Sequence, residues 1–281
     1  MNTPNQTYQT ALAQHQAGQT ATAEALYHQV LAGDPGHMEA TFNLAALLTA
    51  QGRAEEAIPL YLQVLEVLPE DPDTLSNLGN AHAQAGQLDA AADCYRRALV
   101  ANPLLAAAHA NLGNLLYQHG DTDSAIECYQ EAISIDPTVA NVHNNLGTIL
   151  LAAGRNDEAK ESYQAALRAD PNSPDAFKNY GNILLSFGDA EGALEALRQA
   201  VTLAPKWGAA HADLGLVLTR LDRFAEARQA LETALELQPE FIEAWNCLGN
   251  LLLLMELHED SELALKRAEA LEADNTLTAF Y

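Results

Sequence analysis

Residues 109–120 read HANLGNLLYQHG, and residues 143–154, which lie 34 residues further along the chain, read HNNLGTILLAAG. Both stretches hold Asn-Leu-Gly, then an apolar run, then a second glycine. The same period marks the rest of the chain, because a proline recurs every 34 residues from Pro35 to Pro239. Self-similarity at one fixed spacing is typical of repeat architectures.

We therefore interpret residues 1–281 as one solenoid domain of eight repeats, numbered so that the proline takes position 32. The repeats span residues 4–37, 38–71, 72–105, 106–139, 140–173, 174–207, 208–241 and 242–275, and residues 276–281 are a tail or the start of a further helix.

Recurring small residues predict two closely packed helices in each repeat. Position 8 is alanine or glycine in all eight repeats, position 20 is alanine in the first seven, and position 24 is tyrosine in the first five. Glycine at position 15, from Gly18 to Gly188, stops the first helix because glycine adopts the left-handed conformation at low cost. The proline cannot continue the second helix. We expect helices over roughly positions 1–14 and 15–28, whose apolar faces are buried only by stacking, so the fold class is an all-α solenoid.

This pattern resembles the tetratricopeptide repeat (TPR) family, whose signature is W-x2-L-G-x2-Y, A-x3-F and P. The resemblance covers residues 4 to about 275. Position 4 departs from the signature, with His109, His143 and His211 in place of tryptophan, while the last repeat has Trp245. The eighth repeat also has Ser261 at position 20 and Ala273 at position 32, as in a degenerate terminal repeat. The resemblance implies a right-handed superhelix of eight helix-turn-helix units, with the first helices lining a concave groove through positions 2, 5, 6, 9, 12 and 13.

Asparagines recur at two of these inner positions. They are Asn43, Asn77, Asn111, Asn145 and Asn179 at position 6, with Asn80, Asn114 and Asn182 at position 9. An amide side chain carries both a donor and an acceptor, so such a row predicts pairing with the backbone of an extended peptide. The row resembles the TPR superhelix of O-linked N-acetylglucosamine transferases, and that resemblance implies that these eight residues hold peptide segments.

Gene duplication offers a second interpretation of the row, in which the asparagine is copied without being used. Asparagine is less favourable than alanine inside a helix by roughly 0.6 kcal/mol, so an unused row is a standing cost. The packing positions also largely persist in the first and seventh repeats, where position 6 is Gln9 or Asp213. Both observations favour a functional row.

Other constellations in the sequence are weaker. Lys178 and Asn182 match the first half of a TPR carboxylate clamp, but Asp213 and Glu243 stand where the clamp has asparagine and lysine, and they would repel a carboxylate. First helices about 8 to 10 Å apart are too distant for the position-4 histidines to share a metal, so we expect structural histidines. We find no catalytic or cofactor-binding motif and expect a protein that is not an enzyme and has no cofactor or metal.

The composition restricts the partners and the compartment. The formal net charge is −24, from 38 acidic and 14 basic residues, which argues against nucleic acid and anionic membranes as partners. The longest apolar run, Leu251 to Met255, is too short to span a bilayer, and the N-terminus does not resemble a secretory signal. Three cysteines without paired spacing, including Cys94 and Cys128 at equivalent positions, indicate a reducing compartment. We expect a cytoplasmic protein.

The C-terminal end carries an apolar edge. Leu253 and Leu254 occupy inner positions of the last repeat, and Leu277, Phe280 and Tyr281 follow it. Solenoid ends need a polar face, so three interpretations remain open: self-association through this edge, a longer native chain, or a frayed tail.

These observations lead to two functional hypotheses. The first is a scaffold that binds extended, neutral or basic protein segments in its groove through the row of asparagines at positions 6 and 9, which we call the asparagine ladder. The second is the substrate-recruiting TPR region of a larger or partnered enzyme, such as a protein glycosyltransferase.

Overall fold

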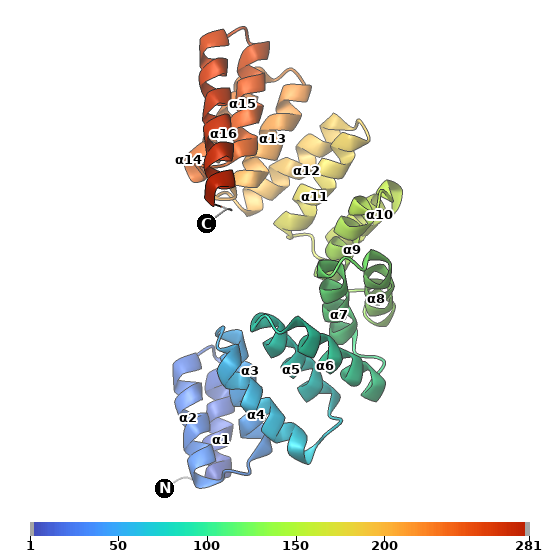
Figure 1. Ribbon diagram of the computed structural model, residues 1–281, viewed down its shortest axis with the longest axis vertical. Helices are drawn as coiled ribbons and strands as arrows, with labels where there is room; N and C mark the ends of the chain where they lie inside the picture. Colours follow the sequence, from blue (N-terminus) through green and yellow to red (C-terminus); the bar gives the residue numbers. More distant parts are fainter. Residues whose placement is uncertain (1–2, 279–281) are drawn as a thin grey trace. The chain divides into compact units, whose positions relative to one another are not determined.

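The computed structural model describes the backbone of residues 3–278 and the side chains as far as residue 273. Over these residues the chain forms sixteen α-helices and no strand (Figure 1). The helices are α1 (Pro4–Gln16), α2 (Thr20–Gly33), α3 (Met38–Ala50), α4 (Ala54–Val67), α5 (Pro72–Gln84), α6 (Leu88–Ala101), α7 (Ala106–Gln118), α8 (Thr122–Ile135), α9 (Ala140–Ala152), α10 (Asn156–Ala169), α11 (Pro174–Ser186), α12 (Ala190–Leu203), α13 (Gly208–Arg220), α14 (Phe224–Leu237), α15 (Ile242–Leu254) and α16 (His258–Thr278). The predicted all-α fold of eight helical hairpins is confirmed.

A left-handed turn joins the two helices of each hairpin. In the fourth repeat the amide of Asp121 donates to the carbonyl of Leu116 at 2.9 Å, across Gly120, whose φ is +81°. This turn occupies positions 14–16, so the second helices of the first seven repeats begin at position 17 and end at position 30, two residues later than expected. The seventh and eighth repeats make the same turn with Asp222 and Glu256, at φ of 57° and 60°.

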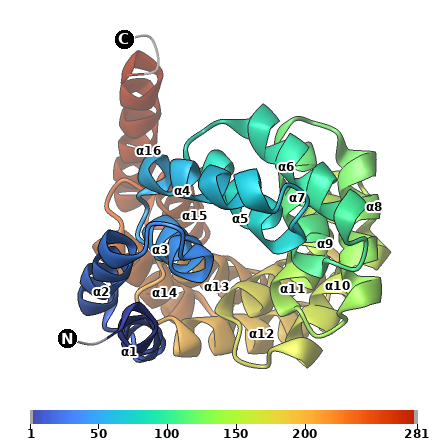
Figure 2. The ribbon, with the colours of Figure 1, turned by 90° about the horizontal axis from the view of Figure 1, so that it is seen from below.

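Core packing inside each hairpin follows from the pairing of positions 8 and 24. The tyrosines at position 24 are all at most 2% exposed: Tyr27, Tyr61, Tyr95, Tyr129 and Tyr163. A Cβ added at Gly79 would lie 2.5 Å from a ring carbon of Tyr95, so glycine is required for the ring to reach its position. The two helices of each hairpin consequently lie side by side, as both ribbon views show (Figures 1 and 2).

The chain divides into two compact units, Met1–Pro137 with α1–α8 and Thr138–Tyr281 with α9–α16. Inside each unit every helix packs against its neighbours in the sequence. First helices of adjacent repeats also contact one another, α3 with α5 and α5 with α7 in the first unit, and α9, α11, α13 and α15 in order in the second. The first helices therefore line the inner side of each stack. That the repeats form one continuous domain stays a prediction.

The last helix continues past the end of the eighth repeat. Helix α16 runs to Thr278, so residues 276–278 continue the last helix, whereas Phe280, Tyr281 and the side chain of Leu277 lie outside the described residues. None of the described helices is long and apolar enough to cross a bilayer.

Candidate functional site

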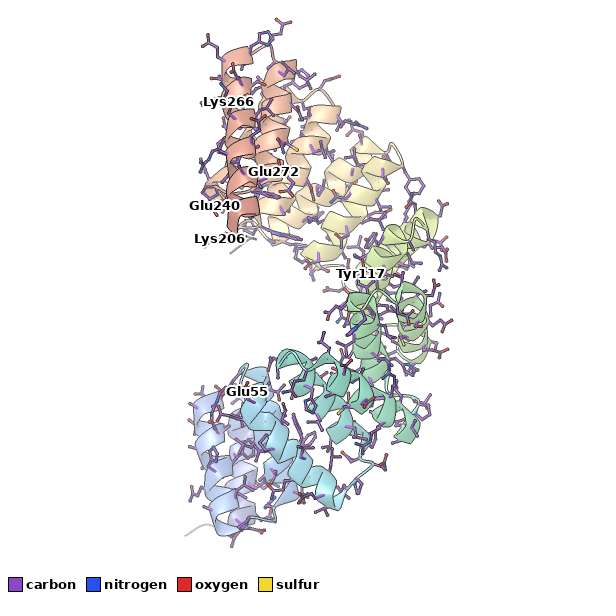
Figure 3. All side chains as sticks on the ribbon, viewed as in Figure 1. Glu55, Tyr117, Lys206, Glu240, Lys266 and Glu272 are labelled. Atoms are coloured by element: carbon purple, nitrogen blue, oxygen red, sulfur yellow. The ribbon has the colours of Figure 1, made fainter. Side chains whose placement is uncertain are left out.

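All eight predicted asparagines lie on first helices and are half-buried. Asn43 is on α3, Asn77 and Asn80 on α5, Asn111 and Asn114 on α7, Asn145 on α9, and Asn179 and Asn182 on α11. Inner positions also carry apolar side chains, such as Tyr117 at position 12 of α7, which is 37% exposed (Figure 3). The side of the stack that the first helices form is therefore amphipathic.

A hydrogen-bond network connects three helices of the first unit through these amides. The hydroxyl of Tyr95 on α6 donates to Oδ1 of Asn80 on α5 at 2.7 Å. Nδ2 of Asn111 on α7 donates to the same oxygen at 2.8 Å. The asparagine at position 6 therefore bonds back to the asparagine at position 9 of the preceding repeat. The hydroxyl of Tyr129 donates to Oδ1 of Asn114 in the same way, so the contact between the tyrosine and position 9 recurs in the next hairpin.

Other position-6 amides also donate to the preceding repeat, but to different acceptors. Nδ2 of Asn43 donates to the hydroxyl of Tyr8 at 2.9 Å, and Nδ2 of Asn179 donates to Oδ1 of Asn144 at 3.0 Å. This structural role of the asparagines was not predicted from the sequence. The signal was present in the joint recurrence of tyrosine at position 24, a polar residue at position 9 and asparagine at position 6 of the next repeat.

Some amide nitrogen and oxygen atoms of these asparagines take no part in the hydrogen-bond network. Nδ2 of Asn80 and Oδ1 of Asn111 form no hydrogen bond within the described part of the chain, although the other atom of each amide is held in the network. The amide of Asn77 has no hydrogen-bond partner among the described residues, because position 9 of the preceding repeat is Ala46. The first unit thus presents both free donors and free acceptors on its first helices.

Asp213 occupies position 6 of the seventh repeat, where a carboxylate clamp has asparagine. Its Oδ2 lies 3.4 Å from Nζ of Lys178 and accepts a hydrogen bond from Nδ2 of Asn182 at 2.7 Å. Nζ of Lys178 also lies 5.5 Å from the ring centroid of Trp207. The chain's own carboxylate therefore satisfies the lysine and the amide that the sequence pattern offered to a ligand.

The position-4 residues form a structural contact with the preceding turn. Nε2 of His109 and of His211 each lie 3.0 Å from a proline carbonyl oxygen, and Nε1 of Trp245 donates to a third such oxygen at 2.9 Å. A carbonyl only accepts, so each of these histidines carries its proton on Nε2 and mimics the indole N–H. Among the described residues no group of three side chains could hold a metal ion.

The three cysteines are free thiols, and burial raises the pKa of each. Raised thiol pKa values are typical of inert, structural cysteines and oppose nucleophilic chemistry.

The apolar edge near the C-terminus is exposed to solvent. Leu253 and Leu254 on α15 are 52% and 58% exposed. Self-association through this edge stays a prediction.

A family model described as "Cilia and flagella-associated protein 70 C-terminal domain" matches residues 104–276, more than half of the chain. Two tetratricopeptide repeat models match residues 14–73 and 79–120. This chain belongs to the TPR family. No curated protein sequence matches it closely enough to count as a relative.

Solved structures support the TPR fold. MamA aligns with a TM-score of 0.53 and 25% identity, over 59% of this chain and 96% of MamA. A chain of the APC/C hetero-tetramer Cut9-Hcn1 aligns with a TM-score of 0.66 and 18% identity, over 93% of this chain and 52% of that one. YrrB, described as a TPR protein with an unusual peptide-binding site, aligns with a TM-score of 0.56 and 24% identity, over 67% of this chain and 97% of YrrB. At 18% and 24% identity these two likenesses concern the fold alone.

Proposed function

We propose that this TPR protein is a non-catalytic scaffold that holds extended segments of other proteins along its first helices through its asparagine side chains. TPR proteins generally mediate protein–protein interactions, and YrrB is described as having a peptide-binding site. The observation that carries the proposal is the pair formed by Asn80 and Asn111, in which one amide keeps a free donor and the other a free acceptor.

This pair is held in place before any ligand arrives. The shared Oδ1 of Asn80 fixes both amide planes, so less side-chain entropy is lost on binding. The free Nδ2 of Asn80 would donate to a backbone carbonyl, and the free Oδ1 of Asn111 would accept from a backbone N–H. Every peptide presents these groups, so binding should depend little on the ligand's sequence and strongly on an accessible, extended backbone.

Asn77 provides the cleanest test, because its amide makes no hydrogen bond that substitution could break among the described residues. Replacing Asn111 instead removes an inter-repeat hydrogen bond and should lower the melting temperature as well as weaken binding. Asn77→Ala should weaken binding and leave the melting temperature unchanged or slightly higher, since alanine is the better helix former.

The experiment begins with a phage-displayed library of random short peptides selected on the full chain. Selected peptides, made synthetically with a fluorophore, are titrated by anisotropy against the wild type, Asn77→Ala and the control Asn156→Ala. The control removes an exposed amide at the start of α10, a second helix. We expect Asn77→Ala to weaken binding by roughly fivefold and N-methylation of the peptide backbone to weaken it further. Equal affinity for wild type and Asn77→Ala, or for plain and N-methylated peptides, would contradict backbone recognition.

The proposal also includes the charge of the bound segments and the compartment of the protein. With a net charge of −24 the protein should attract neutral or basic segments and disfavour nucleic acid and anionic membranes. The three free cysteines are consistent with a reducing compartment such as the cytoplasm.

A second candidate function is substrate recruitment for an enzyme such as a protein glycosyltransferase. The observation in its favour is that the best-covering family model describes a C-terminal domain, which shows that such repeats occur within longer proteins. Reading the gene upstream of codon 1 as well as downstream of codon 281 tests this candidate. An in-frame stop without a neighbouring enzyme gene would count against it.

A further inference from the structure

A cavity of about 410 Å³ opens among α1, α3, α4 and α5 in the first unit. Its apolar wall is formed by Tyr8, Met38, Phe42, Val64 and Leu68. Tyr8 and Phe42 both occupy inner position 5, so the cavity belongs to the side on which the proposed segment lies. Its volume falls within the range of about 300 to 1,000 Å³ that is usual for ligand pockets.

Three carboxylates, from Glu39, Asp71 and Asp73, also line this cavity. Within the described part of the chain, none of them forms an ion pair with a lysine or arginine. Glu39 lies 3.3 Å from Nδ1 of His37, which is charged only when protonated. Asp71 caps α5 by accepting from the amide and the hydroxyl of Thr74, at 2.8 and 2.6 Å. The cavity therefore combines an apolar wall with a negative charge that the protein does not balance.

We propose that this cavity anchors a basic side chain, arginine or lysine, of the bound segment. The alkyl stem of such a side chain packs on apolar surface while its charged head stays at a polar boundary. The rings of Tyr8 and Phe42 add an aromatic surface suited to a cation. An acidic side chain would be repelled, and a plain alkyl side chain would leave the carboxylates unmatched.

The inference rests on the proposed function, because it supposes that a segment runs along the first helices. Asn77 and Asp73 lie four residues apart on α5 and therefore share one face of this helix. A backbone held by the free amide of Asn77 would thus pass beside the cavity. The anchor would make basic segments preferred over neutral ones, in a protein whose amide contacts do not distinguish between sequences.

The methionines allow a direct test on the full chain. Met1, Met38 and Met255 are the three methionines, and of the two within the described residues Met38 lines the cavity whereas Met255 does not. With ¹³C-methyl-labelled methionine, Nα-acetyl-arginine methylamide should shift the methyl signal of Met38 saturably and leave that of Met255 unchanged. An uncharged analogue with a similar alkyl stem but no guanidinium, Nα-acetyl-norleucine methylamide, should bind the same place at least roughly fivefold more weakly. Equal binding of the two probes, or no shift at Met38, would overturn the anchor.

A variant that lacks two of the cavity's carboxylates distinguishes binding in the cavity from attraction of the cationic probe by the protein's overall negative charge. Glu39→Gln combined with Asp73→Asn removes two exposed carboxylates and keeps the capping Asp71. The control, Glu55→Gln with Asp89→Asn, removes two exposed carboxylates from the first turns of α4 and α6, and Glu55 can be seen in Figure 3. We expect the first variant to bind the arginine probe roughly fivefold more weakly than the control does. An equal loss in both variants would show long-range attraction only and overturn the anchor.

The two proposals can fail separately. Both probes carry the same two amide groups, so any contact with the amide of Asn77 contributes equally to both and cancels in the comparison between them. Binding of the arginine probe together with unaltered peptide affinity in Asn77→Ala would keep the anchor and reject the ladder. Weakened peptide binding in Asn77→Ala together with equal binding of both probes would keep the ladder and reject the anchor.

Discussion

Repeats 1 and 2 place their core tyrosine differently from repeats 3 to 5. In the first two repeats position 8 is alanine, position 9 is Leu12 or Ala46, and neither tyrosine bonds to position 9. In the next three repeats position 8 is glycine and the tyrosine hydroxyl donates to position 9. These pairs are Tyr95 with Asn80, Tyr129 with Asn114, and Tyr163 with Thr148. The absence of a methyl group at position 8 thus accompanies a hydrogen bond at position 9.

This difference shows that a core position and an inner-face position are chemically coupled. Glycine lets the ring lie against the first helix, and the ring's hydroxyl then needs an acceptor beside it. An asparagine at position 9 provides that acceptor and also receives the amide of the following repeat, as Asn80 does. Where position 9 offers no acceptor, the hydroxyl of Tyr61 is buried and forms no hydrogen bond of normal geometry among the described residues. Burial raises the pKa of Tyr61 to about 12, and the nearby side chain of Thr49 acts in the opposite direction.

The largest effect is expected from giving repeat 3 the alanine of repeats 1 and 2. In Gly79→Ala the new methyl would overlap the ring of Tyr95, at 2.5 Å, and push its hydroxyl away from Asn80. Overpacking costs about 1 to 3 kcal/mol and the lost hydrogen bond about 1, while alanine returns about 1 as a helix former. We expect the free energy of unfolding to fall by about 2 kcal/mol in urea titrations followed by circular dichroism.

The matched control is Gly113→Ala in the next repeat. There the nearest atoms to an added Cβ lie at 3.3 Å, so small shifts should accommodate it. We expect a loss below about 1 kcal/mol, since the helix propensity of alanine offsets part of the strain. Equal losses in the two variants would show that ring contact does not distinguish the repeats.

A smaller effect separates the two kinds of tyrosine hydroxyl. Tyr95→Phe removes a hydrogen bond and should lower the free energy of unfolding by about 1 kcal/mol. Tyr61→Phe removes a buried hydroxyl that has no partner among the described residues, so it should be neutral or stabilising by up to about 1 kcal/mol. Thermal and urea denaturation of both variants measure the contrast. A comparable loss in Tyr61→Phe would mean that its hydroxyl has a partner after all.

The hairpins were predictable from sequence because their determinants are local and repeat. Proline at position 32 and glycine at position 15 mark the two helix ends in nearly every repeat, and the hydrophobic period fixes the buried faces. The left-handed turns at Asp222 and Glu256 were not predicted from residue type, since glutamate does not favour positive φ and aspartate adopts it far less readily than glycine. There the packing of the hairpin imposes the turn that glycine permits elsewhere.

The site was predictable only in part. The sequence identified the asparagines and their helices, but not that Asn111 donates to Asn80, because that contact spans 31 residues and depends on where Tyr95 places its hydroxyl. The cavity beside Met38 was also missed, since its walls come from four helices of three repeats. Periodicity shows which residues share a face, whereas hydrogen bonds and cavities depend on distances between helices.

The smallest effect should come from converting repeat 2 to the pattern of repeat 3. Ala45→Gly combined with Ala46→Asn would let the ring of Tyr61 approach the first helix, give its hydroxyl an acceptor and give the amide of Asn77 a partner, as Asn80 does for Tyr95 and Asn111. The two hydrogen bonds together contribute about 2 kcal/mol, whereas asparagine costs about 0.6 and glycine about 1 in a helix, so we expect a gain near 0.5 kcal/mol. In a double-mutant cycle with Tyr61→Phe most of this gain should disappear. A gain that survives in the Tyr61→Phe background would separate the core tyrosine from the asparagine row, because the new amide would then act without the hydroxyl.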